Sequence, residues 1–421
     1  MSKLQVELAN VRSSTLGHNA AWMFAGQGLS IICQAVYFVL LARLLGSIQY
    51  GVYVTAVAMV SILSQYSSFG SPAVLLRYVS PSPTNFALYW GNTLVTIFTL
   101  GIFLAVVLTW AVPHIAHSCS STMVLCVAIG DCICAQIALA AGRVFQAFEK
   151  LRMTAGLNLL TNLLRALMAG AMFWSLKHAT ARQWVVAALG VSVLAACTAL
   201  VLVTRHYGKP AFSPPLLKER MGEGFIFALS ASTTNIYNDF DKAMLGHYGM
   251  NAANGIYTMA YRVVDVCMMP ISSIHSAAFP RFFQKGTTGI KGTSAYAKRI
   301  LKRTVPMGLL LAAVMFLAAP LMPCLVGAGF GESVTALRWL CLLPLFRSFQ
   351  LSAGDAITGA GHQKFRLYSQ AASASFNFGT NLYLVPHFGW QGAAWSSLAT
   401  DGLLGILNWS ILLAIPRRSR G

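Results

Sequence analysis

Apolar segments long enough to cross a bilayer recur about twelve times along this chain of 421 residues. Hydrophobic residues make up 56% of the sequence and charged residues 10%, whereas charged residues make up about 25% of a typical soluble domain. Each crossing takes about 20 residues, so the connections between segments must be short. We therefore predict an all-α polytopic membrane protein. The predicted segments are residues 20–44, 52–76, 86–110, 121–141, 154–176, 184–204, 225–249, 253–280, 304–327, 334–360, 367–388 and 390–415.

Basic residues concentrate on every second connection between these segments. Of the 30 lysines and arginines, 22 lie in the N-terminal tail, the even-numbered connections and the C-terminal tail, and five lie within segments. Only Arg43, at the end of the first segment beside the first connection, and Lys177 and Arg182 belong to odd-numbered connections. Because basic loops stay on the cytoplasmic side, the pattern predicts that both termini are cytoplasmic. Topology and anionic lipid headgroups then account for the net charge of +19, and we expect no nucleic-acid partner.

A polar connection at residues 205–224 divides the chain into two halves of six predicted segments. We predict an N-terminal six-helix lobe at residues 1–204, a cytoplasmic linker at 205–224, and a C-terminal six-helix lobe at 225–421. A second long connection, residues 281–303, carries seven basic residues. We interpret it as a loop that sets the topology, or, in its later part, as an amphipathic helix in the membrane interface.

The two halves resemble each other at an offset of about 204 residues. The motif Tyr-Gly-Val-Tyr at 50–53 parallels Asn-Gly-Ile-Tyr at 254–257, and residues 71–77 parallel residues 275–281. With six segments in each half, both halves start in the cytoplasm. The repeat is therefore parallel, with a pseudo-twofold axis along the membrane normal, which is typical of transporters. The alternative is a coincidence of composition between two apolar helix pairs.

Charged residues inside the segments are the main candidates for function. A charge at the bilayer centre costs about 2.5–3.5 kcal/mol on insertion scales, so such residues usually face a cavity or a partner. The candidates are Asp131, Arg165, Asp239, Asp241, Lys242, Arg262, Asp265, Arg338, Arg347, Asp355 and Asp401. In the seventh segment, Asn238 and Lys242 are four residues apart and Asp239 and Lys242 three apart, so they share a helix face.

Two interpretations of these charges remain open. In the first they line a polar cavity, where basic and amide side chains hold an anionic head group and carboxylates bind a coupling cation or proton. In the second they neutralise one another, with Arg262 pairing Asp265 and Lys242 pairing Asp239 or Asp241. The substrate-binding candidates are Arg262, Arg165, Arg347, Lys242, Asn235 and Asn238. The ion-coupling candidates are Asp241, Asp239, Asp265, Asp131 and Asp355. For Arg338 we expect a snorkelling surface role.

Patterns typical of enzymes and of metal sites are missing from the sequence. Neither standard nucleotide-binding glycine-rich loop occurs, which argues against an ATP-driven pump within this chain. His114, His117 and Cys119 share one external loop, but three possible ligands in a flexible loop are a weak signal. The nine cysteines are scattered and indicate no disulfide framework. We expect no cofactor, no metal site and no catalytic residue.

Three stretches of the sequence resemble a known family. The first runs from Leu41–Gly46 to Tyr50–Tyr53. The second runs from Asp241–Gly246 through Tyr257 and Tyr261-Arg262 to Phe279-Pro280-Arg281. The third is His387–Trp395. They are similar to the polysaccharide-transport branch of the multidrug/oligosaccharidyl-lipid/polysaccharide (MOP) flippase superfamily. Length, segment number and the two halves fit along essentially the whole chain. The resemblance implies two six-helix bundles in a V-shaped MATE-like fold, which work by alternating access.

The resemblance also implies a cargo. We expect export of an undecaprenyl-pyrophosphate-linked O-antigen or exopolysaccharide unit from the cytoplasmic to the periplasmic leaflet of the bacterial inner membrane. Arg262, just after Tyr261, falls where related lipid-linked precursor flippases carry a functional arginine. The first segment departs from some relatives because it has no basic residue between Ala20 and Ala42, and Arg165 is a candidate substitute. A polysaccharide polymerase and chain-length machinery are the expected protein partners.

Two other classes of function fit parts of the sequence. A multidrug cation antiporter could use the same fold, and carboxylates would then outnumber arginines in its cavity. Arg165, Arg262 and Arg347 favour an anionic cargo instead. A membrane-embedded glycosyltransferase or polymerase is the third class, but no external loop is large enough for a catalytic domain.

Overall fold

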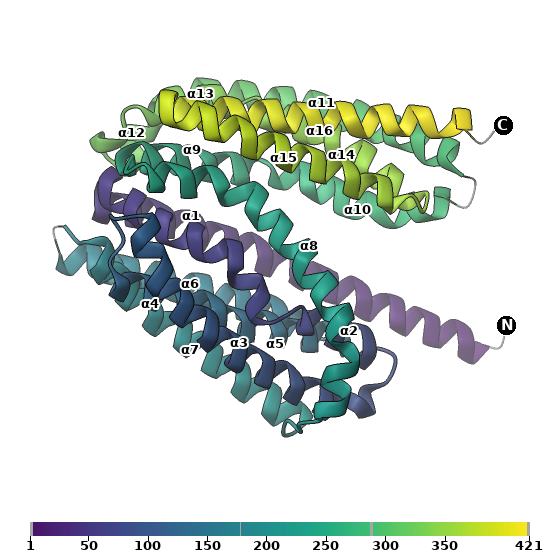
Figure 1. Cartoon of the computed structure of the whole chain (residues 1–421). Coiled ribbons are helices and arrows are strands. Elements are labelled where there is room, and N and C mark those ends of the chain that lie inside the picture. The colour runs from purple at the N-terminus through teal and green to yellow at the C-terminus, as the bar shows by residue number, and fades with distance from the viewer. Residues whose placement is uncertain (1–2, 177, 287–288, 419–421) are drawn as a thin grey trace. The chain divides into compact units, whose positions relative to one another are not determined.

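The computed structural model describes the backbone of residues 3–176, 178–286 and 289–418. It describes the side chains of residues 28–415 except those at 177, 234, 280, 287 and 288. Within these residues every regular element is helical (Figure 1). Each of the twelve predicted segments coincides with one helix or with consecutive helices. The predicted all-α class is therefore confirmed.

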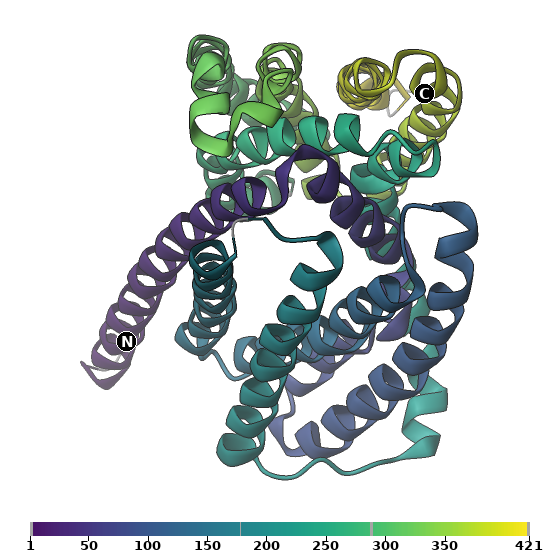
Figure 2. The ribbon, with the colours of Figure 1, turned by 90° about the vertical axis from the view of Figure 1, so that its left-hand side faces the viewer.

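The first two predicted segments lie on one element, α1 (Lys3–Ser67), which changes direction sharply at Gly46 (Figure 2). Gly46 has φ 67° and ψ 172°, a conformation that glycine adopts without the steric cost of a Cβ atom. The second segment, predicted as 52–76, is not continuous. Its helix ends at Ser67, Phe69 and Gly70 take positive φ, and α2 (Ser71–Val79) starts with Pro72 in its first turn.

Two compact units make up the chain, and the first consists of Met1–Leu45 and Thr55–Asp239. Its apolar core contains Trp90, Phe145 and Leu75, all fully buried. Thr180 caps α7, because its hydroxyl accepts the backbone N–H of Gln183 while its own N–H donates to the Gln183 side chain. Besides α1 and α2, the elements of this unit are η1 (Pro83–Asn85), α3 (Phe86–Ile115), α4 (Ser121–Ile129), η2 (Gly130–Cys134), α5 (Ala135–Ala147), α6 (Leu151–Ser175), α7 (Ala181–Tyr207) and the first part of α8 (Pro214–His247).

A π-helical turn, η2, interrupts the helix that runs from α4 into α5. It carries Asp131, one of the predicted functional carboxylates. Gly101 of α3 lies against this turn, since a Cβ atom there would come within 2.9 Å of the Cys132 carbonyl oxygen. The glycine therefore leaves room for the wider turn. Such π-bulges occur frequently at functional sites.

The second unit consists of Gly46–Val54 and Phe240–Gly421. Its core includes Phe282, Ala353 and Ile357. Helices α15 and α16 pack side by side along their length (Figure 1). The elements that follow α8 are α9 (Asn251–Cys267), α10 (Met269–Gly286), α11 (Ile290–Ala318), η3 (Ala319–Leu321), α12 (Met322–Val326), η4 (Ala328–Phe330), α13 (Ser333–Leu340), α14 (Leu343–Gly359), α15 (Gln363–Phe388) and α16 (Trp390–Arg418).

The similar motifs of the two halves meet at a pair of glycines. A Cβ atom on Gly51 would lie 1.7 Å from the carbonyl oxygen of Asn251, and one on Gly255 would lie 2.1 Å from that of Ser47. The backbones of α1 and α9 therefore touch where each motif carries its glycine. This contact explains why the short segment Gly46–Val54 belongs to the second unit.

The compact units divide the chain at positions other than the predicted 1–204, 205–224 and 225–421. Most of the 205–224 connection is helical, because α7 continues to Tyr207 and α8 begins at Pro214. The division between units falls at Asp239, within α8. The early part of this helix contacts the first unit, where a Cβ atom on Gly70 would lie 2.1 Å from the Gly224 carbonyl oxygen.

The basic connection predicted at 281–303 is also largely helical. Helix α10 continues to Gly286 and α11 begins at Ile290. On the first turns of α11, Ile290, Ala297 and Ile300 are buried. The basic side chains on the same turns are exposed, namely Lys291, Lys298, Arg299, Lys302 and Arg303. This part of α11 is therefore amphipathic.

Seven described stretches are long and apolar enough to cross a membrane. They include the first six predicted segments, the ninth and the twelfth, the first two being joined in one stretch. The seventh, eighth, tenth and eleventh segments fall outside this set. Two helices of these segments, α9 and α14, have 17 residues each and are shorter than the other spanning stretches. The four segments carry Lys242, Arg262, Arg347 and Asn377.

Candidate functional site

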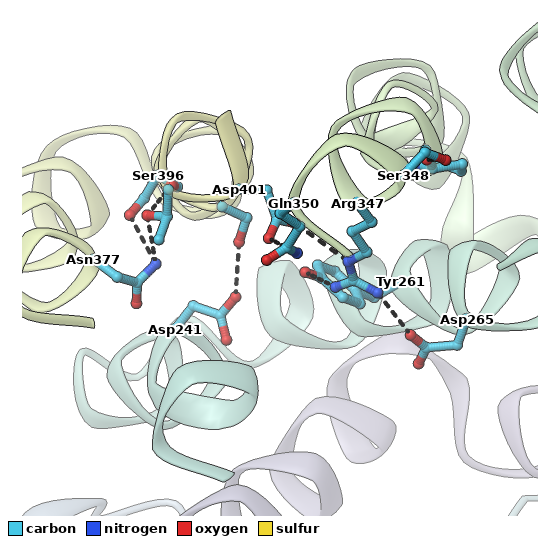
Figure 3. A network of polar contacts seen from close by, with 12 residues as sticks. Asp241, Tyr261, Asp265, Arg347, Ser348, Gln350, Asn377, Ser396 and Asp401 are labelled. Atoms are coloured by element: carbon cyan, nitrogen blue, oxygen red, sulfur yellow. Dashed lines mark hydrogen bonds and ion pairs between the residues drawn. The ribbon is translucent and has the colours of Figure 1, made fainter. Parts of the chain in front are cut away.

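Arg347 is the centre of a polar network in the second unit (Figure 3). It lies one turn into α14, and its side chain is only 15% exposed. Its Nη2 donates to the Tyr261 hydroxyl at 2.9 Å, and its Nε donates to Asp401 Oδ2 at 3.2 Å. Its Nη1 lies 3.7 Å from Asp265. Gln350, one turn further along α14, donates to the other Asp401 oxygen at 2.9 Å. Arg347 thus joins α14 to α9 and α16.

Arg262 lies on the more open side of the same network. Its Nη1 is 3.8 Å from Asp265 Oδ2, and the two side chains are 35% and 44% exposed. Asp265 therefore lies between two guanidinium groups, those of Arg262 and Arg347. The buried Tyr50, from the first repeat motif, also interacts with Arg262. A guanidinium that is paired at this distance and partly open can still receive an anionic ligand.

Lys242 and Asp241 lie on α8, and both are buried. The Lys242 ammonium lies 5.2 Å from the centroid of the Tyr261 ring, which is within the range of a cation–π contact. The Asp241 carboxylate accepts hydrogen bonds from the Tyr257 hydroxyl and, at 3.4 Å, from Ser397. The Arg347 guanidinium also lies over this ring, 5.4 Å from its centroid, so Tyr261 contacts two basic side chains.

A second polar network joins α15 to α16 near Asp241 (Figure 3). The Asn377 amide donates to Thr400 at 3.1 Å and to Ser396 at 3.4 Å, and Asn381 donates to the Asn377 carbonyl at 3.0 Å. These residues were not among the sequence candidates. The signal that could have found them is two asparagines four residues apart in an apolar segment, because buried amides need partners on a neighbouring helix.

Other sequence candidates lie in the first unit. Asp239 accepts a hydrogen bond from Ser61 at 2.7 Å, and Asn235 donates to the Ser61 carbonyl at 2.9 Å. Asp131, on the π-helical turn, is close enough to Arg165 and Asp239 to interact electrostatically with both. The structure therefore brings these candidates together in one group of their own. Asn238 lies four residues before Lys242 on α8, as predicted.

Asp355 and Arg338 lie outside both groups. Asp355 is on α14 but pairs with His275 of α10 and Arg366 of α15. Arg338 lies on α13, with its guanidinium 4.9 Å from the centroid of the Phe316 ring. The contacts described here thus form three groups, of which the Arg347 network is the largest. Among the described side chains no three histidines, cysteines or carboxylates lie together as metal ligands would.

The Arg347 network combines fixed positive charge with aromatic surfaces inside helices of a membrane protein. Arg347 and Lys242 contact Tyr261, Arg262 is the next residue of α9, and Asp265 and Asp401 supply negative charge. Arginine presents several N–H donors in a planar fork that suits phosphate oxygens. Carboxylates on the same helices can exchange pairing partners when an anion enters. The arrangement is suited to reversible binding of a phosphorylated head group, and it contains no arrangement for covalent chemistry among the described residues.

Solved structures with the same fold define the class of this protein. A multidrug-resistance MATE transporter of the MOP superfamily, in an inward-facing conformation, superposes with a TM-score of 0.74, at 13% identity, over 91% of this chain and 96% of that one. The lipid II flippase MurJ, in an inward closed conformation, gives 0.76, at 12% identity, over 92% and 87%. A MOP superfamily transporter from Pyrococcus furiosus gives 0.62, at 14% identity, over 94% and 93%. The chain is a polytopic membrane protein with the MOP superfamily fold.

A family model places the chain more closely. The model described as "Polysaccharide biosynthesis protein" matches residues 16–285, which is more than half of the chain. The protein belongs to this family. No curated protein sequence matches the chain at a significant level. The predicted resemblance is confirmed at the level of the family and of the fold.

Proposed function

We propose that the protein is a flippase for a lipid-linked oligosaccharide. Its cargo is an O-antigen or exopolysaccharide unit on undecaprenyl pyrophosphate, moved from the cytoplasmic to the periplasmic leaflet of the bacterial inner membrane. A sugar chain is too polar to cross lipid unaided, so a polar cavity that opens to one side at a time lowers the barrier. The polyprenyl tail stays in the lipid while the head group moves.

The arginine-rich network around Tyr261 is the observation that carries this proposal. A pyrophosphate needs positive charge and N–H donors, and Arg262, Arg347 and Lys242 supply both at one place in the membrane segments. Membership of a family of polysaccharide biosynthesis proteins supports a glycan rather than a drug as cargo. Arg165, which belongs to the first unit, is a separate candidate for binding a head group.

An ion gradient is the energy source that we propose, because the sequence contains no nucleotide-binding loop. The carboxylate candidates for this coupling are Asp241, Asp239, Asp265, Asp131 and Asp355. Asp241 is buried against the hydroxyls of Tyr257 and Ser397. Such a carboxylate can take up a proton or a cation and release it when its surroundings change.

Replacement of Arg262 tests the proposed cargo. Arg262→Ala should abolish export of the glycan while leaving the amount of membrane-inserted protein unchanged, because it removes the most open guanidinium of the network. The measurement is surface polysaccharide in a strain that lacks the wild-type gene, with protein quantified in the same membranes. Arg338→Ala is the matched control, since this arginine lies outside the network, and export should continue. Normal surface polysaccharide in the Arg262→Ala strain would overturn the assignment.

A multidrug cation antiporter is the second candidate function, favoured by the fold shared with MATE transporters and by buried carboxylates such as Asp241. The same strains distinguish the two. An antiporter would change the resistance of the cells to cationic drugs and leave surface polysaccharide unaffected. A membrane-embedded glycosyltransferase or polymerase would instead show activity with a nucleotide sugar in detergent.

A further inference from the structure

His275 forms a buried ionic group away from the Arg347 network. It lies on α10, and its Nδ1 is 2.9 Å from Asp355 Oδ2 on α14. The other carboxylate oxygen of Asp355 is 3.4 Å from Arg366 Nη1 on α15, and the same Nη1 donates to Thr358 at 2.9 Å. The group thus connects three helices of the second unit. In the sequence, Asp355 lies 80 residues after His275 and 11 residues before Arg366.

His275 is the most deeply placed histidine that the structure describes. Its side chain is 5% exposed and that of Asp355 is 8% exposed. His362 is half-buried. The other described histidine side chains are exposed, namely His114, His117, His178, His206, His247 and His387. Histidine is the side chain whose ordinary pKa allows it to change charge between about pH 5 and 8.

The second ring nitrogen of His275 adds a further observation. Nε2 is buried, and among the described residues no group lies within hydrogen-bonding distance of it. In the neutral imidazole with a proton on Nδ1, this nitrogen presents a lone pair. A proton can therefore be added at Nε2 without breaking the contact between Nδ1 and Asp355. A buried ring nitrogen without a partner is uncommon in folded proteins and calls for an explanation.

The charges that face His275 come from α14 and α15. Asp355 lies directly against Nδ1, and Arg366 lies beyond it. Arg281 and Lys285, on α10 itself, are exposed. The basic side chains of the neighbouring α11 are exposed as well. The Arg262–Asp265 pair belongs to α9 and to the Arg347 network. The positive charge of a proton added to His275 is therefore balanced by the Asp355 carboxylate, which also pairs with Arg366.

Arg366 reaches this carboxylate because Gly354 has no side chain. A Cβ atom on Gly354 would lie 3.2 Å from Arg366 Nε. The guanidinium is 24% exposed, so it extends from the surface to the buried Asp355. A metal cation would be repelled by this guanidinium, whereas a proton needs only the free nitrogen of His275. The chemistry of the group therefore favours a proton over a metal ion.

The helices that hold His275 also hold the Arg347 network. Asp355 and Arg347 are both on α14, eight residues apart, which is about 12 Å along the helix axis. His275 follows α9, which carries Arg262 and Asp265, after the break at Met268. Helices α10 and α14 touch near their C-terminal ends, since a Cβ atom on Gly286 would lie 1.9 Å from the Gly359 carbonyl oxygen. A change in the pairing of His275 can thus shift α10 against α14 and alter the network at its other end.

We propose that His275, with Asp355 and Arg366, is a proton-binding site that couples the proton gradient to movement of the cargo. This inference rests on the proposed flippase function and names its coupling ion and residues. The imidazole takes a proton from water on one side of the membrane and becomes an imidazolium paired with Asp355. When the helices rearrange, it returns the proton to water on the other side. Binding of the proton changes which of His275 and Arg366 holds the carboxylate more closely.

The first experiment measures protonation of His275 directly in the purified protein in lipid nanodiscs. Deuterium exchange at the imidazole C2 position, followed by mass spectrometry between about pH 5 and pH 9, reports the protonation of each histidine. The exchange rate of His275 should change with pH across this range. In Asp355→Asn this change should differ from that of the wild type, because the neighbouring negative charge is removed. His362 in the same samples is the internal control, and its exchange should be the same in both proteins.

Two results of this experiment would overturn the proton site. One is an exchange rate of His275 that does not change across the range. The other is an exchange rate of His275 that changes with pH in Asp355→Asn as it does in the wild type. Because the first measurement uses the wild-type protein, it remains decisive if a variant fails to fold. It also requires no transport, so it tests the site separately from the proposed function.

The second experiment tests coupling in proteoliposomes that contain undecaprenyl pyrophosphate with a fluorescent oligosaccharide. Translocation by the wild type should accelerate severalfold when a pH gradient is imposed, and His275→Gln should lose this acceleration. His362→Gln is the matched control and should keep it. Retained acceleration in His275→Gln would overturn the coupling role. Absence of translocation by the wild type, with His275 titrating normally, would reject the flippase function and leave the proton site standing.

Discussion

At the scale of single residues, the main feature of the second unit is that two arginines share three carboxylate contacts. Arg347 contacts Asp401 and Asp265, and Arg262 contacts Asp265. Asp401 is 1% exposed, whereas Asp265 is 44% exposed. The Arg347–Asp401 pair is therefore structural, because it is enclosed, while the Asp265 side is open to exchange. A ligand that displaces Asp265 would be bound by both arginines without breaking the buried pair.

Removal of Arg347 should destabilise the protein, because Asp401 would lose its guanidinium while still buried. Breaking one side of a buried pair typically costs about 3–5 kcal/mol. Arg347→Ala should therefore lower the thermal unfolding temperature in detergent markedly. The double variant Arg347→Ala/Asp401→Asn should recover part of the loss, since no buried charge remains. If the double variant is no more stable than Arg347→Ala, the pair does not have this structural role.

The sequence predicted which residues carry charge inside the membrane and offered the local pair Arg262–Asp265, which the structure contains. It could not predict the pairs between residues that are far apart in the chain. Arg347 and Asp401 are 54 residues apart, and His275 and Asp355 are 80 apart. Such partners are determined by which helices pack together, and this depends on the whole core. Arg366 lies between the predicted segments 334–360 and 367–388, yet its side chain reaches the buried Asp355. His275 was noted only as part of a repeat motif, because a single histidine in an apolar stretch carries no periodic signal.

At the scale of elements, glycines decide where helices can touch and where they turn. Gly46 turns α1, Gly101 makes room for the π-helical turn, and Gly51 and Gly255 allow two helices to cross at contact distance. The sequence predicted the helical segments because apolar residues run for about 20 positions in each. It did not predict the breaks inside them, such as the one at Phe69–Gly70, because a short turn hardly changes the hydropathy of the segment. The π-helical turn was not predicted either, since one extra residue in a helix leaves no trace in composition.

Adding a methyl group at the crossing of α1 and α9 should destabilise the fold. In Gly255→Ala the new Cβ atom would lie 2.1 Å from the Ser47 carbonyl oxygen, so the helices must separate. Overpacking of this kind typically costs about 1–3 kcal/mol. Gly190→Ala in α7 is the matched control, because nothing lies within 4 Å of its Cβ position. We expect a lower unfolding temperature for the first variant only. Equal unfolding temperatures for the two variants would contradict the close contact.

At the scale of the whole molecule, the alternating distribution of basic residues predicts how the chain lies in the membrane. The fold of the MOP superfamily is established by the structural similarity, and family membership by the family model. Neither the fold nor the family membership says which side of the membrane each terminus is on. The prediction of cytoplasmic termini rests on the positive-inside rule alone, applied to the 30 lysines and arginines.

Reporter fusions test this orientation. At either terminus, a fused reporter that works only in the cytoplasm should be active. A reporter that works only in the periplasm should be inactive there. A reporter inserted at Ser118, in the short connection between α3 and α4, should give the opposite result. A periplasmic C-terminus together with a cytoplasmic N-terminus would mean that the chain crosses the membrane an odd number of times, and the predicted count of segments would then be wrong.

The crossing of Gly51 with Gly255 has a consequence for the origin of the chain. The two residues occupy the same position in the repeated motif, and each faces the backbone beside the other. If the two halves descend from one duplicated gene, this contact is a residue meeting its own copy, as at the axis of an isologous dimer. The ancestral protein would then have been a homodimer of a six-helix chain. A substitution at that single glycine would have changed both sides of the crossing at once, whereas in the present chain the two sides can vary separately.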